Sequence, residues 1–246
     1  MSELQAAVPR PEVARVPRHV AIIMDGNHRW AKARGMPGAA GHRAGTKNVR
    51  PIAEACADAG VEFLTLFALS TENLDRPKRE VTLLLELMRR FLEENVDELN
   101  ERGVRLRMIG DRSRFAAELQ MLMMRAEQLT RHNTRLHLTI AASFGGRWDI
   151  VQSARELAKA VAEGRLSPDD IDENCLAEHL SIGNLPAPDL CIRTGGDHRI
   201  SNFLLWDLAY TELYFTDAYW PEFKPARLLE AFESYAGRQR RFGLRA

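Results

Sequence analysis

The chain has 246 residues, of which 45% are hydrophobic and 7% aromatic, enough for one globular domain with a substantial core. Its 34 lysine and arginine residues balance its 34 aspartate and glutamate residues. The overall charge therefore gives no attraction to nucleic acid or acidic membranes, and any anion site must be built locally.

Residues 1–18 contain three prolines and scattered charges but no apolar segment typical of a signal peptide. We expect a flexible leader over 1–18 and one domain over 19–246. No apolar run approaches the ~20 residues that span a bilayer. The cysteines, Cys56, Cys175 and Cys191, are odd in number and widely spaced, which favours reduced thiols in a cytoplasmic protein.

Short apolar runs alternate with longer helical patterns along the chain. Strands are predicted at residues 19–24, 61–69, 104–109, 136–143 and 190–192, and helices at 46–59, 81–100, 114–130, 150–163 and 174–180. Gly60, Gly103 and Gly164 are placed as helix stops, and Ser167 before Pro168 as a helix start. This alternation predicts an α/β domain whose mostly parallel central sheet is flanked by helices.

Ligands of open α/β sheets bind beyond the carboxyl ends of the strands. After the first predicted strand come Asp25, Gly26, Asn27, His28 and Arg29, an acid, a flexible glycine and a cation typical of a metal and phosphate site. The alternative is an ordinary turn in which Asp25 caps the next helix.

Residues 41–45 (Gly-His-Arg-Ala-Gly) precede the helix predicted at 46–59. Their backbone N–H groups are expected to face an anion at the helix N-terminus, with His42 and Arg43 adding charge. The pattern matches neither the Walker loop nor G-x-G-x-x-G, so it carries little weight alone.

The second predicted strand is followed by Ser70, Thr71, Glu72, Asn73 and Arg76. These residues suit a polar substrate segment, or else a helix-capping box with a solvated Glu72.

After the fifth predicted strand, Arg193, Arg199 and Ser201 surround a glycine pair, a composition suited to a diphosphate. Glu212 lies in an apolar stretch and needs a cation or a strong donor nearby; a paired structural acid is the alternative role. The helix beginning near Val81 is apolar around most of its circumference, which fits either core burial or the wall of a hydrocarbon tunnel.

Five ordered blocks resemble bacterial undecaprenyl diphosphate synthases, which are cis-prenyltransferases, from residue 19 to residue 243. They are HVAIIMDGN at 19–27, GHRAG at 41–45, STEN at 70–73, FGGRWDI at 144–150 and the segment 193–217. The resemblance implies that 19–246 is a catalytic domain condensing isopentenyl diphosphate onto farnesyl diphosphate to make undecaprenyl diphosphate, the carrier-lipid precursor for cell-wall glycans. It also implies a homodimer, a hydrophobic tunnel, Mg²⁺ without an organic cofactor, no nucleic acid, and transient contact with the inner membrane surface during product release.

The resemblance assigns roles to individual residues. Asp25 and Glu212 match metal-site acids, and Asn73 is catalytic by position. A neutral amide is a poor base, so a diphosphate oxygen held by Asn73 is the easier proton acceptor. Residues 241–243 resemble a C-terminal Arg-x-Gly motif that contacts phosphate across the dimer. The substrate-binding residues carried over are Gly26, Asn27, His28, Arg29, Trp30, His42, Ser70, Thr71, Glu72, Arg76, Arg193, Arg199, Ile200 and Ser201.

Three positions depart from the family pattern: Leu74 stands where Trp is usual, Gly38 where many members have Arg, and Asp197 where Glu is common. Leu74 also occurs in short-chain members, so a short-chain synthase is one alternative. A catalytically silent scaffold subunit would lack Asp25 and its loop. A haloacid-dehalogenase-type phosphohydrolase would need an acid where Asn27 stands.

Overall fold

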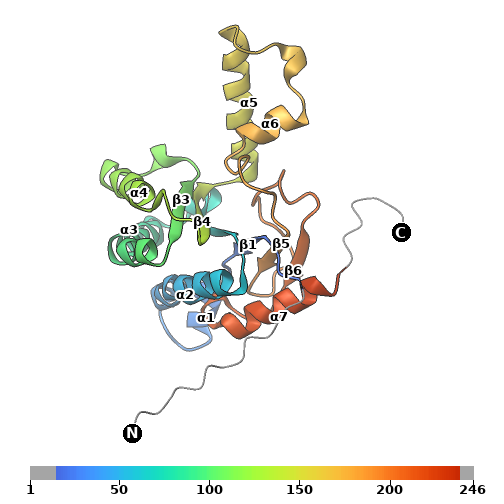
Figure 1. Ribbon diagram of the computed structural model, residues 1–246. Coiled ribbons are helices and arrows are strands. Elements are labelled where there is room, and N and C mark those ends of the chain that lie inside the picture. Colours follow the sequence, from blue (N-terminus) through green and yellow to red (C-terminus); the bar gives the residue numbers. More distant parts are fainter. Residues whose placement is uncertain (1–14, 239–246) are drawn as a thin grey trace.

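The computed structural model describes residues 15–238, which form one parallel sheet between layers of helices (Figure 1). The strands are β1 (His19–Ile23), β2 (Phe63–Ser70), β3 (Val104–Ile109), β4 (Leu136–Phe144), β5 (Leu190–Arg193) and β6 (Glu212–Phe215). The α-helices are α1 (Asn27–Lys32), α2 (Gly38–Ala59), α3 (Lys78–Glu101), α4 (Ala117–Thr130), α5 (Gly146–Ala162), α6 (Glu173–His179) and α7 (Pro225–Ala236). Short 3₁₀ helices are η1 (Glu72–Asp75), η2 (Arg112–Arg114), η3 (Pro168–Asp170) and η4 (Trp220–Glu222).

The sheet has the strand order β3-β4-β2-β1-β5-β6, and every pairing is parallel. β1 lies between β2 and β5, so the chain leaves it in one direction to β2 and later returns to its other side at β5. This reversal is a topological switch point, where the carboxyl ends of neighbouring strands leave room for a ligand.

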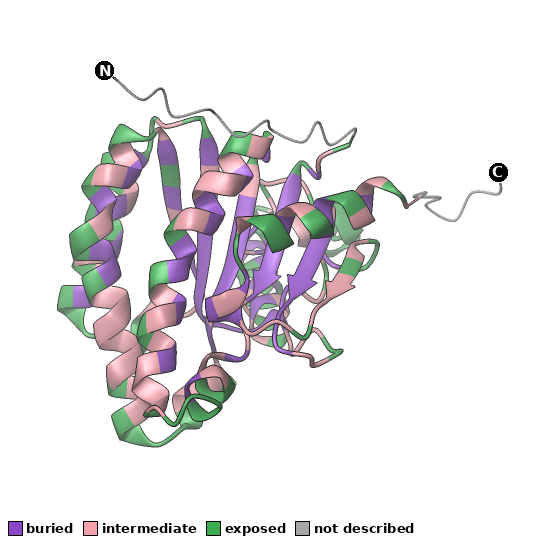
Figure 2. Ribbon diagram, turned by 90° about the horizontal axis from the view of Figure 1, so that it is seen from below, coloured by how far each residue is buried: buried purple, intermediate pink, exposed green. Residues whose placement is uncertain are grey.

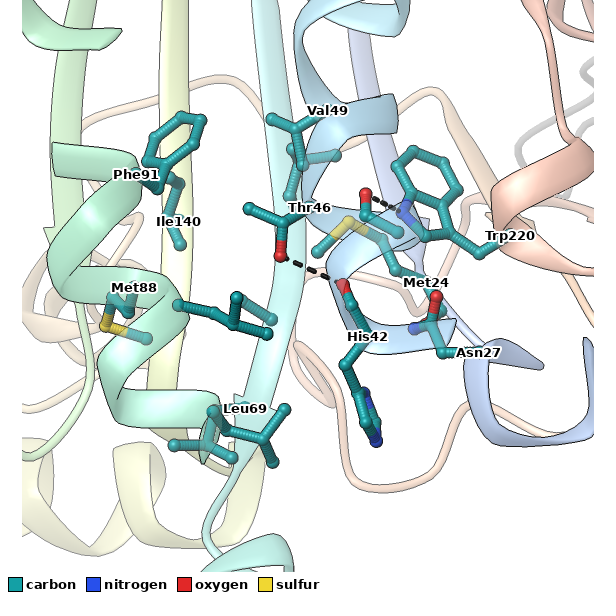
Figure 3. A pocket seen from close by; sticks show the side chains of 15 residues that line it. Met24, Asn27, His42, Thr46, Val49, Leu69, Met88, Phe91, Ile140 and Trp220 are labelled. Carbon is teal, nitrogen blue, oxygen red and sulfur yellow. Dashed lines mark hydrogen bonds between the residues drawn. The ribbon is translucent and has the colours of Figure 1, made fainter. Parts of the chain in front are cut away.

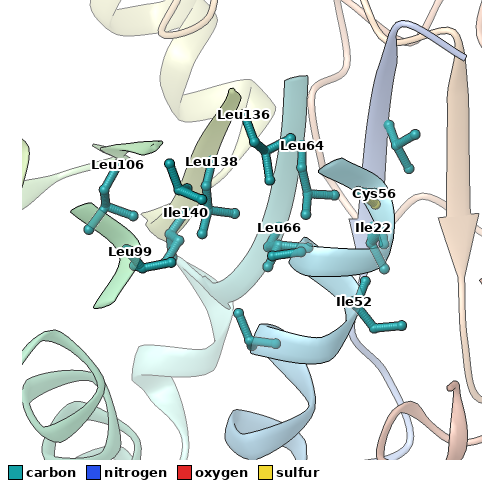
Figure 4. Packing of buried hydrophobic residues seen from close by; sticks show 14 of the residues in the cluster. Ile22, Ile52, Cys56, Leu64, Leu66, Leu99, Leu106, Leu136, Leu138 and Ile140 are labelled. Carbon is teal, nitrogen blue, oxygen red and sulfur yellow. The ribbon is translucent and has the colours of Figure 1, made fainter. Parts of the chain in front are cut away.

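Alternating side chains of the strands divide the core between the two faces of the sheet. One face packs against α2, α3, α4 and α7, and its cluster includes Ile22, Leu66 and Ile140 (Figure 4). The other face packs against Phe203, Leu204 and their neighbours. Figure 2 shows buried strands between helices whose outer sides are exposed. The predicted α/β sheet is confirmed.

The structure corrects several local predictions. The helix predicted at 46–59 begins eight residues earlier, at Gly38, and β6, α1 and α7 were not predicted. Ser167 caps the short η3, whereas the cap of α6 is Asp172, whose side chain accepts from the backbone N–H of Cys175. Gly60 ends α2 with φ 92°, as predicted.

Some predictions fall outside the described residues: most of the expected leader at 1–18, and the C-terminal motif at 241–243. Within residues 15–238, no helix combines the length and apolar character needed to cross a membrane.

Candidate functional site

A cleft of about 740 Å³ lies at the carboxyl ends of β1, β2 and β5. It brings together residues predicted from four separate segments of the sequence. Those lining it are Asp25, Gly26, Asn27, His28, Arg29, His42, Ser70, Glu72, Asn73, Arg76, Arg193, Arg199 and Ser201.

Asp25 lies at the end of β1, in contact with two arginines. Its Oδ2 is 2.9 Å from Nη2 of Arg193 and 3.1 Å from Nη2 of Arg29, and its Oδ1 accepts from the backbone N–H of Gly26 at 2.6 Å. Burial raises the pKa of Asp25. The hydrogen bonds from Arg193 and Gly26 and the charge of Arg29 outweigh this effect, so the pKa lies below its ordinary value. The helix-cap alternative is wrong, because Gly26 is the N-cap of α1 and no side chain caps it.

Arg193 is almost fully buried and organises the floor of the cleft. Its Nη1 donates to the carbonyl of Arg199 at 2.5 Å and to Oγ of Ser201 at 2.6 Å. Its Nη2 reaches Asp25, and Asp197 at 3.3 Å, while its Nε is buried without a partner. A buried donor without an acceptor is costly, so Nε of Arg193 favours an added acceptor beside it.

The cleft carries an excess of positive charge. Its described lining includes five arginines and three carboxylates. One of these carboxylates, Asp197, pairs with Arg29, Arg193 and Arg199. Ser201 and its neighbour Asn202 have positive φ angles of 47° and 62°, a strained conformation that clusters at functional sites. The arrangement suits a multiply charged anion such as a diphosphate.

The segment after β2 forms the opposite wall. The backbone N–H of Ser70 donates to Oδ1 of Asn73, and the N–H of Asn73 donates to Oγ of Ser70. Glu72 is exposed and accepts from the side chain of Asn202 at 2.7 Å, and the reciprocal bonds of Ser70 and Asn73 have the capping-box pattern, so this alternative holds beside the place of the segment in the cleft. Asn73 therefore has a fixed side-chain orientation at the edge of the cleft.

His42 extends this wall from α2. Burial lowers its pKa, an effect that the charge of Glu80, 3.5 Å away, partly opposes. Glu80 is shared with Arg76, to which it pairs at 2.9 Å.

Residues 41–45 do not form the anion-binding loop predicted for them. They lie inside α2, where backbone N–H groups bond within the helix. A Cβ at Gly41 would come 1.9 Å from the carbonyl oxygen of Asn27, and one at Gly45 would come 2.1 Å from its Oδ1. These glycines allow α2 to approach the loop after β1.

An apolar cavity of about 100 Å³ joins the cleft (Figure 3). Met24, Asn27, His42, Ala68 and Leu84 line both spaces. Leu87, Met88 and Phe91 of α3 form the next part of the cavity wall, whereas Leu92, Val96 and Leu99 are buried in the core. The helix α3 therefore contributes both to the main core and to the wall of an apolar cavity.

Four predicted residues do not line the cleft. Trp30 is half-buried and stacks with Arg34 at 4.6 Å, and Oγ1 of Thr71 donates to Glu72. Ile200 packs into the second core cluster. Glu212 begins β6, opposite Leu190 in the register, and pairs with Arg238 at 2.9 Å, so it lies toward the other end of the sheet.

The structure adds Arg147 and Asn202 to the cleft lining. Both lie in sequence blocks that carry the family resemblance, but nothing local marked them. Asn202 accepts from the backbone N–H of Arg147 at 2.9 Å and so links the start of α5 to the cleft.

Comparison with known proteins agrees with this geometry. Residues 23–243 match the family model described as "Putative undecaprenyl diphosphate synthase". Two relatives are named ditrans,polycis-undecaprenyl-diphosphate synthase ((2E,6E)-farnesyl-diphosphate specific). The one from Pseudomonas aeruginosa is 58% identical over 228 residues, covering 93% of this chain and 91% of the relative. The one from Pseudomonas putida is 55% identical over 243 residues, covering 99% and 95%.

Solved structures show the same fold. Lavandulyl diphosphate synthase from Lavandula x intermedia, in complex with dimethylallyl diphosphate, has a TM-score of 0.90 and 43% identity over 94% of this chain and 99% of that one. A probable undecaprenyl diphosphate synthase from Campylobacter jejuni has a TM-score of 0.78 and 31% identity, over 93% and 99%. The chain therefore belongs to the undecaprenyl diphosphate synthase family of prenyltransferases.

Proposed function

We propose that the chain condenses isopentenyl diphosphate onto farnesyl diphosphate to make undecaprenyl diphosphate, the activity in the names of its bacterial relatives. The observation that carries the proposal is the direct junction between an arginine-rich cleft and an apolar cavity. An allylic diphosphate bound at Gly26 and Arg29 would leave its hydrocarbon chain beside Met24 and Leu84. The same product would serve as the precursor of carrier lipid for cell-wall glycans.

The cleft can stabilise the charge that develops during transfer. As the allylic C–O bond breaks, negative charge grows on the departing diphosphate, and the guanidinium groups of Arg29 and Arg76 are positioned to stabilise it, while Arg193 is proposed to bind the diphosphate of isopentenyl diphosphate. The double bond of isopentenyl diphosphate then attacks the allylic carbon, and one proton leaves. Asn73 is proposed to hold the diphosphate oxygen that accepts this proton, because a neutral amide is itself a poor base.

A Mg²⁺ ion fits Asp25 together with the substrate. Within residues 15–238 no group of three or more histidine, cysteine or acidic side chains could hold a metal. Mg²⁺ is commonly bound by one or two carboxylates plus substrate phosphates, so a single carboxylate beside a diphosphate site suffices. The bound ion would neutralise part of the diphosphate charge. Glu212 lies away from Asp25 within one subunit. Its predicted role as a second metal-associated acid stays a prediction, since it would need a second subunit.

A homodimer is part of the proposal. Trp206, Tyr210 and Leu213 are large hydrophobic residues exposed within eight positions, and Leu213 lies on the edge strand β6. Exposed apolar groups of this kind beside an edge strand favour a protein partner. A second copy of the chain is the partner that the family resemblance implies.

Transient contact with the membrane surface by a cytoplasmic enzyme completes the proposal, because the product is very apolar. The outer side of α4 exposes Met121, Met124 and Leu129 next to Arg125. Apolar and basic side chains on one helix side suit the surface of an anionic bilayer.

A short-chain cis-prenyl diphosphate synthase is the second candidate. It is favoured by Leu74, which packs against the main core, and by the high structural similarity to lavandulyl diphosphate synthase. The two candidates share the cleft and differ in how far the product chain grows.

The test is a product assay with radiolabelled isopentenyl diphosphate, farnesyl diphosphate and Mg²⁺, with dephosphorylated products separated by length. Metal-dependent product near the undecaprenyl length is expected, and a short product would select the second candidate. Asp25→Ala should fold normally and lose turnover by at least about 100-fold, since it removes a group that acts on the developing charge. Near-normal activity of this variant at saturating Mg²⁺ would refute the assignment of Asp25.

A further inference from the structure

Asn202 bonds to two segments that lie far from it in the sequence. Its side-chain amide donates to Oε1 of Glu72 at 2.7 Å, and its Oδ1 accepts from the backbone N–H of Arg147 at 2.9 Å. Its own carbonyl oxygen accepts from the backbone N–H of Gly146 at 2.6 Å. Both polar atoms of the side chain are therefore engaged, one by the segment after β2 and the other by the start of α5.

Two of these bonds cap α5 from outside its own sequence. The first N–H groups of an α-helix have no partner within the helix, and Gly145, which precedes α5, supplies no side-chain cap. A Cβ at Gly145 would come 2.6 Å from Nδ2 of Asn202 and 2.8 Å from Oγ1 of Thr71. The glycine therefore leaves the space in which the segment after β2, the start of α5 and Asn202 meet.

The backbone of Asn202 has the left-handed conformation, with φ 62°. Asparagine and aspartate adopt this conformation more readily than other residues with a side chain. The preceding residue, Ser201, accepts from Nη1 of Arg193 at 2.6 Å. On the other side of the contact, Oε2 of Glu72 accepts from Oγ1 of Thr71 at 3.0 Å, so both carboxylate oxygens are held.

The bond from Asn202 to the segment after β2 joins the two sides of the cleft. Within residues 15–238 it is the one hydrogen bond between residues 70–76 and residues 193–205. One side carries Asn73 and the other carries Ser201. Condensation requires the double bond of one substrate to face the allylic carbon of the other, and a small misplacement of reacting atoms lowers the rate strongly.

We propose that Asn202 is a positioning residue that fixes the distance between these two sides of the cleft and so aligns the two substrates. It acts through the segments that it joins and takes no part in bond making. This inference rests on the proposed function, whose two diphosphates occupy the two sides.

The test begins with Asn202→Asp. Aspartate keeps the side-chain shape, the tolerance of positive φ and the oxygen that caps α5, but it places an acceptor against the carboxylate of Glu72. With both substrates saturating, kcat should fall by about tenfold, because alignment is lost. KM for isopentenyl diphosphate should change by less than about threefold, because Arg193 and Ser201 are retained. The thermal midpoint should stay unchanged, because the cap remains.

Reversal of the hydrogen bond supplies the rescue. In Asn202→Asp combined with Glu72→Gln, the glutamine amide can donate to the aspartate, so kcat should return to the level of Glu72→Gln alone. The matched control is Asn202→Asp combined with Glu72→Ala, which has the same net charge but no donor. This control should stay about tenfold below the rescued enzyme.

Equal kcat for the two double variants would overturn the proposal, as would wild-type kcat in Asn202→Asp. A lower thermal midpoint and a lower kcat that Glu72→Gln does not restore would also overturn it, by making Asn202 only a cap of α5. A wild-type protein that adds no isopentenyl units would instead refute the proposed function. Amide hydrogen exchange over residues 70–76 would then decide whether Asn202 holds this segment: exchange should be faster in Asn202→Asp and should return to the wild-type rate with Glu72→Gln.

Discussion

Arg193 positions both the acid and the loop of the cleft. One terminal nitrogen contacts Asp25 and the other contacts the backbone of Arg199 and the hydroxyl of Ser201. Both terminal guanidinium nitrogens are used, which explains why the residue is arginine, since lysine has a single ammonium group. The geometry of the cleft therefore depends on a single buried side chain.

Arg193→Lys should raise KM for isopentenyl diphosphate by about 10- to 100-fold, the size expected for losing charged hydrogen bonds of about 1.5–3 kcal/mol. Arg199→Lys is the control, because Arg199 is exposed and, within residues 15–238, its side chain forms one ion pair, with Asp197. Steady-state kinetics with isopentenyl diphosphate varied would measure both. Equal effects of the two substitutions would contradict the role given to Arg193.

Gly38 is explained by the side chain that rests on it. A Cβ at position 38 would lie 2.7 Å from Nδ1 of His28, so a larger residue there must displace the imidazole, which lines the cleft. The arginine that many family members have at position 38 would therefore collide with His28 in this chain.

Gly38→Ala should raise KM for farnesyl diphosphate by about threefold to tenfold, equivalent to losing one hydrogen bond of about 1 kcal/mol. The thermal midpoint should stay the same or rise, because alanine is the better helix former. His28→Ala should reproduce the kinetic change. If Gly38→Ala binds farnesyl diphosphate normally while His28→Ala does not, the displacement argument fails.

At the scale of elements, close packing of α2 on the loop after β1 brings the walls of the cleft together. Gly41 and Gly45 contact Asn27, and Trp220 of η4 donates its indole N–H to the carbonyl of Gly45 at 2.8 Å. Asn48 donates to the carbonyls of Trp220 and Phe223. The position of α2 is thus specified by small residues and by buried hydrogen bonds.

Gly41→Ala should destabilise the protein by about 1–3 kcal/mol, because its Cβ overlaps a backbone carbonyl. That corresponds to a fall of several degrees in the thermal midpoint of a chain of this length. Gly237→Ala is the matched control: φ there is −74° and a Cβ would meet nothing closer than 3.8 Å. The control should be neutral or slightly stabilising. Equal thermal midpoints for the two variants would contradict this account of Gly41.

At the scale of the whole molecule, a buried acid, Asp149, and a half-buried one, Asp207, make stability depend on pH. Burial, and then the charge of Asp149, raise the pKa of Asp207 to about 7. Asp149 itself is held by Ser181, whose Oγ donates to it at 2.6 Å. Asp149 lies on α5 and Asp207 on the segment before β6, close enough for the charge of one to affect the titration of the other.

The folded state keeps the proton on Asp207 up to about pH 7, whereas an unfolded aspartate releases it near pH 4. The folded state binds more protons in this window, so the contribution of Asp207 to stability is full below about pH 4 and is lost by about pH 7. Relative to Asp207→Asn, the unfolding free energy of the wild type should fall by on the order of 4 kcal/mol from pH 4 to pH 7.

Urea denaturation at fixed protein concentration would measure this difference. Asp97→Asn, at an exposed position of α3, is the control and should show no such trend. A constant difference between wild type and Asp207→Asn across the window would contradict the effect of burial on Asp207.

The sequence by itself determined the parallel α/β fold and most of the cleft. Strands β1 to β5 were predicted because each is a short apolar run, a local signal that burial on both faces imposes. Asp25, Ser70 and Arg193 could be grouped because the carboxyl ends of parallel strands meet at one edge. Both inferences need only local pattern and a general rule of topology.

Only the tertiary structure decided the rest. The tertiary contacts brought Asn202 to Glu72, placed residues 41–45 inside α2, set Glu212 away from the cleft in this chain and joined Arg50 to Glu98. Each of these facts depends on contacts between segments far apart in the sequence, or on which residue of a helix faces its neighbour. Local composition does not encode them, because the same side chain pairs, packs or faces solvent according to what the rest of the fold places beside it.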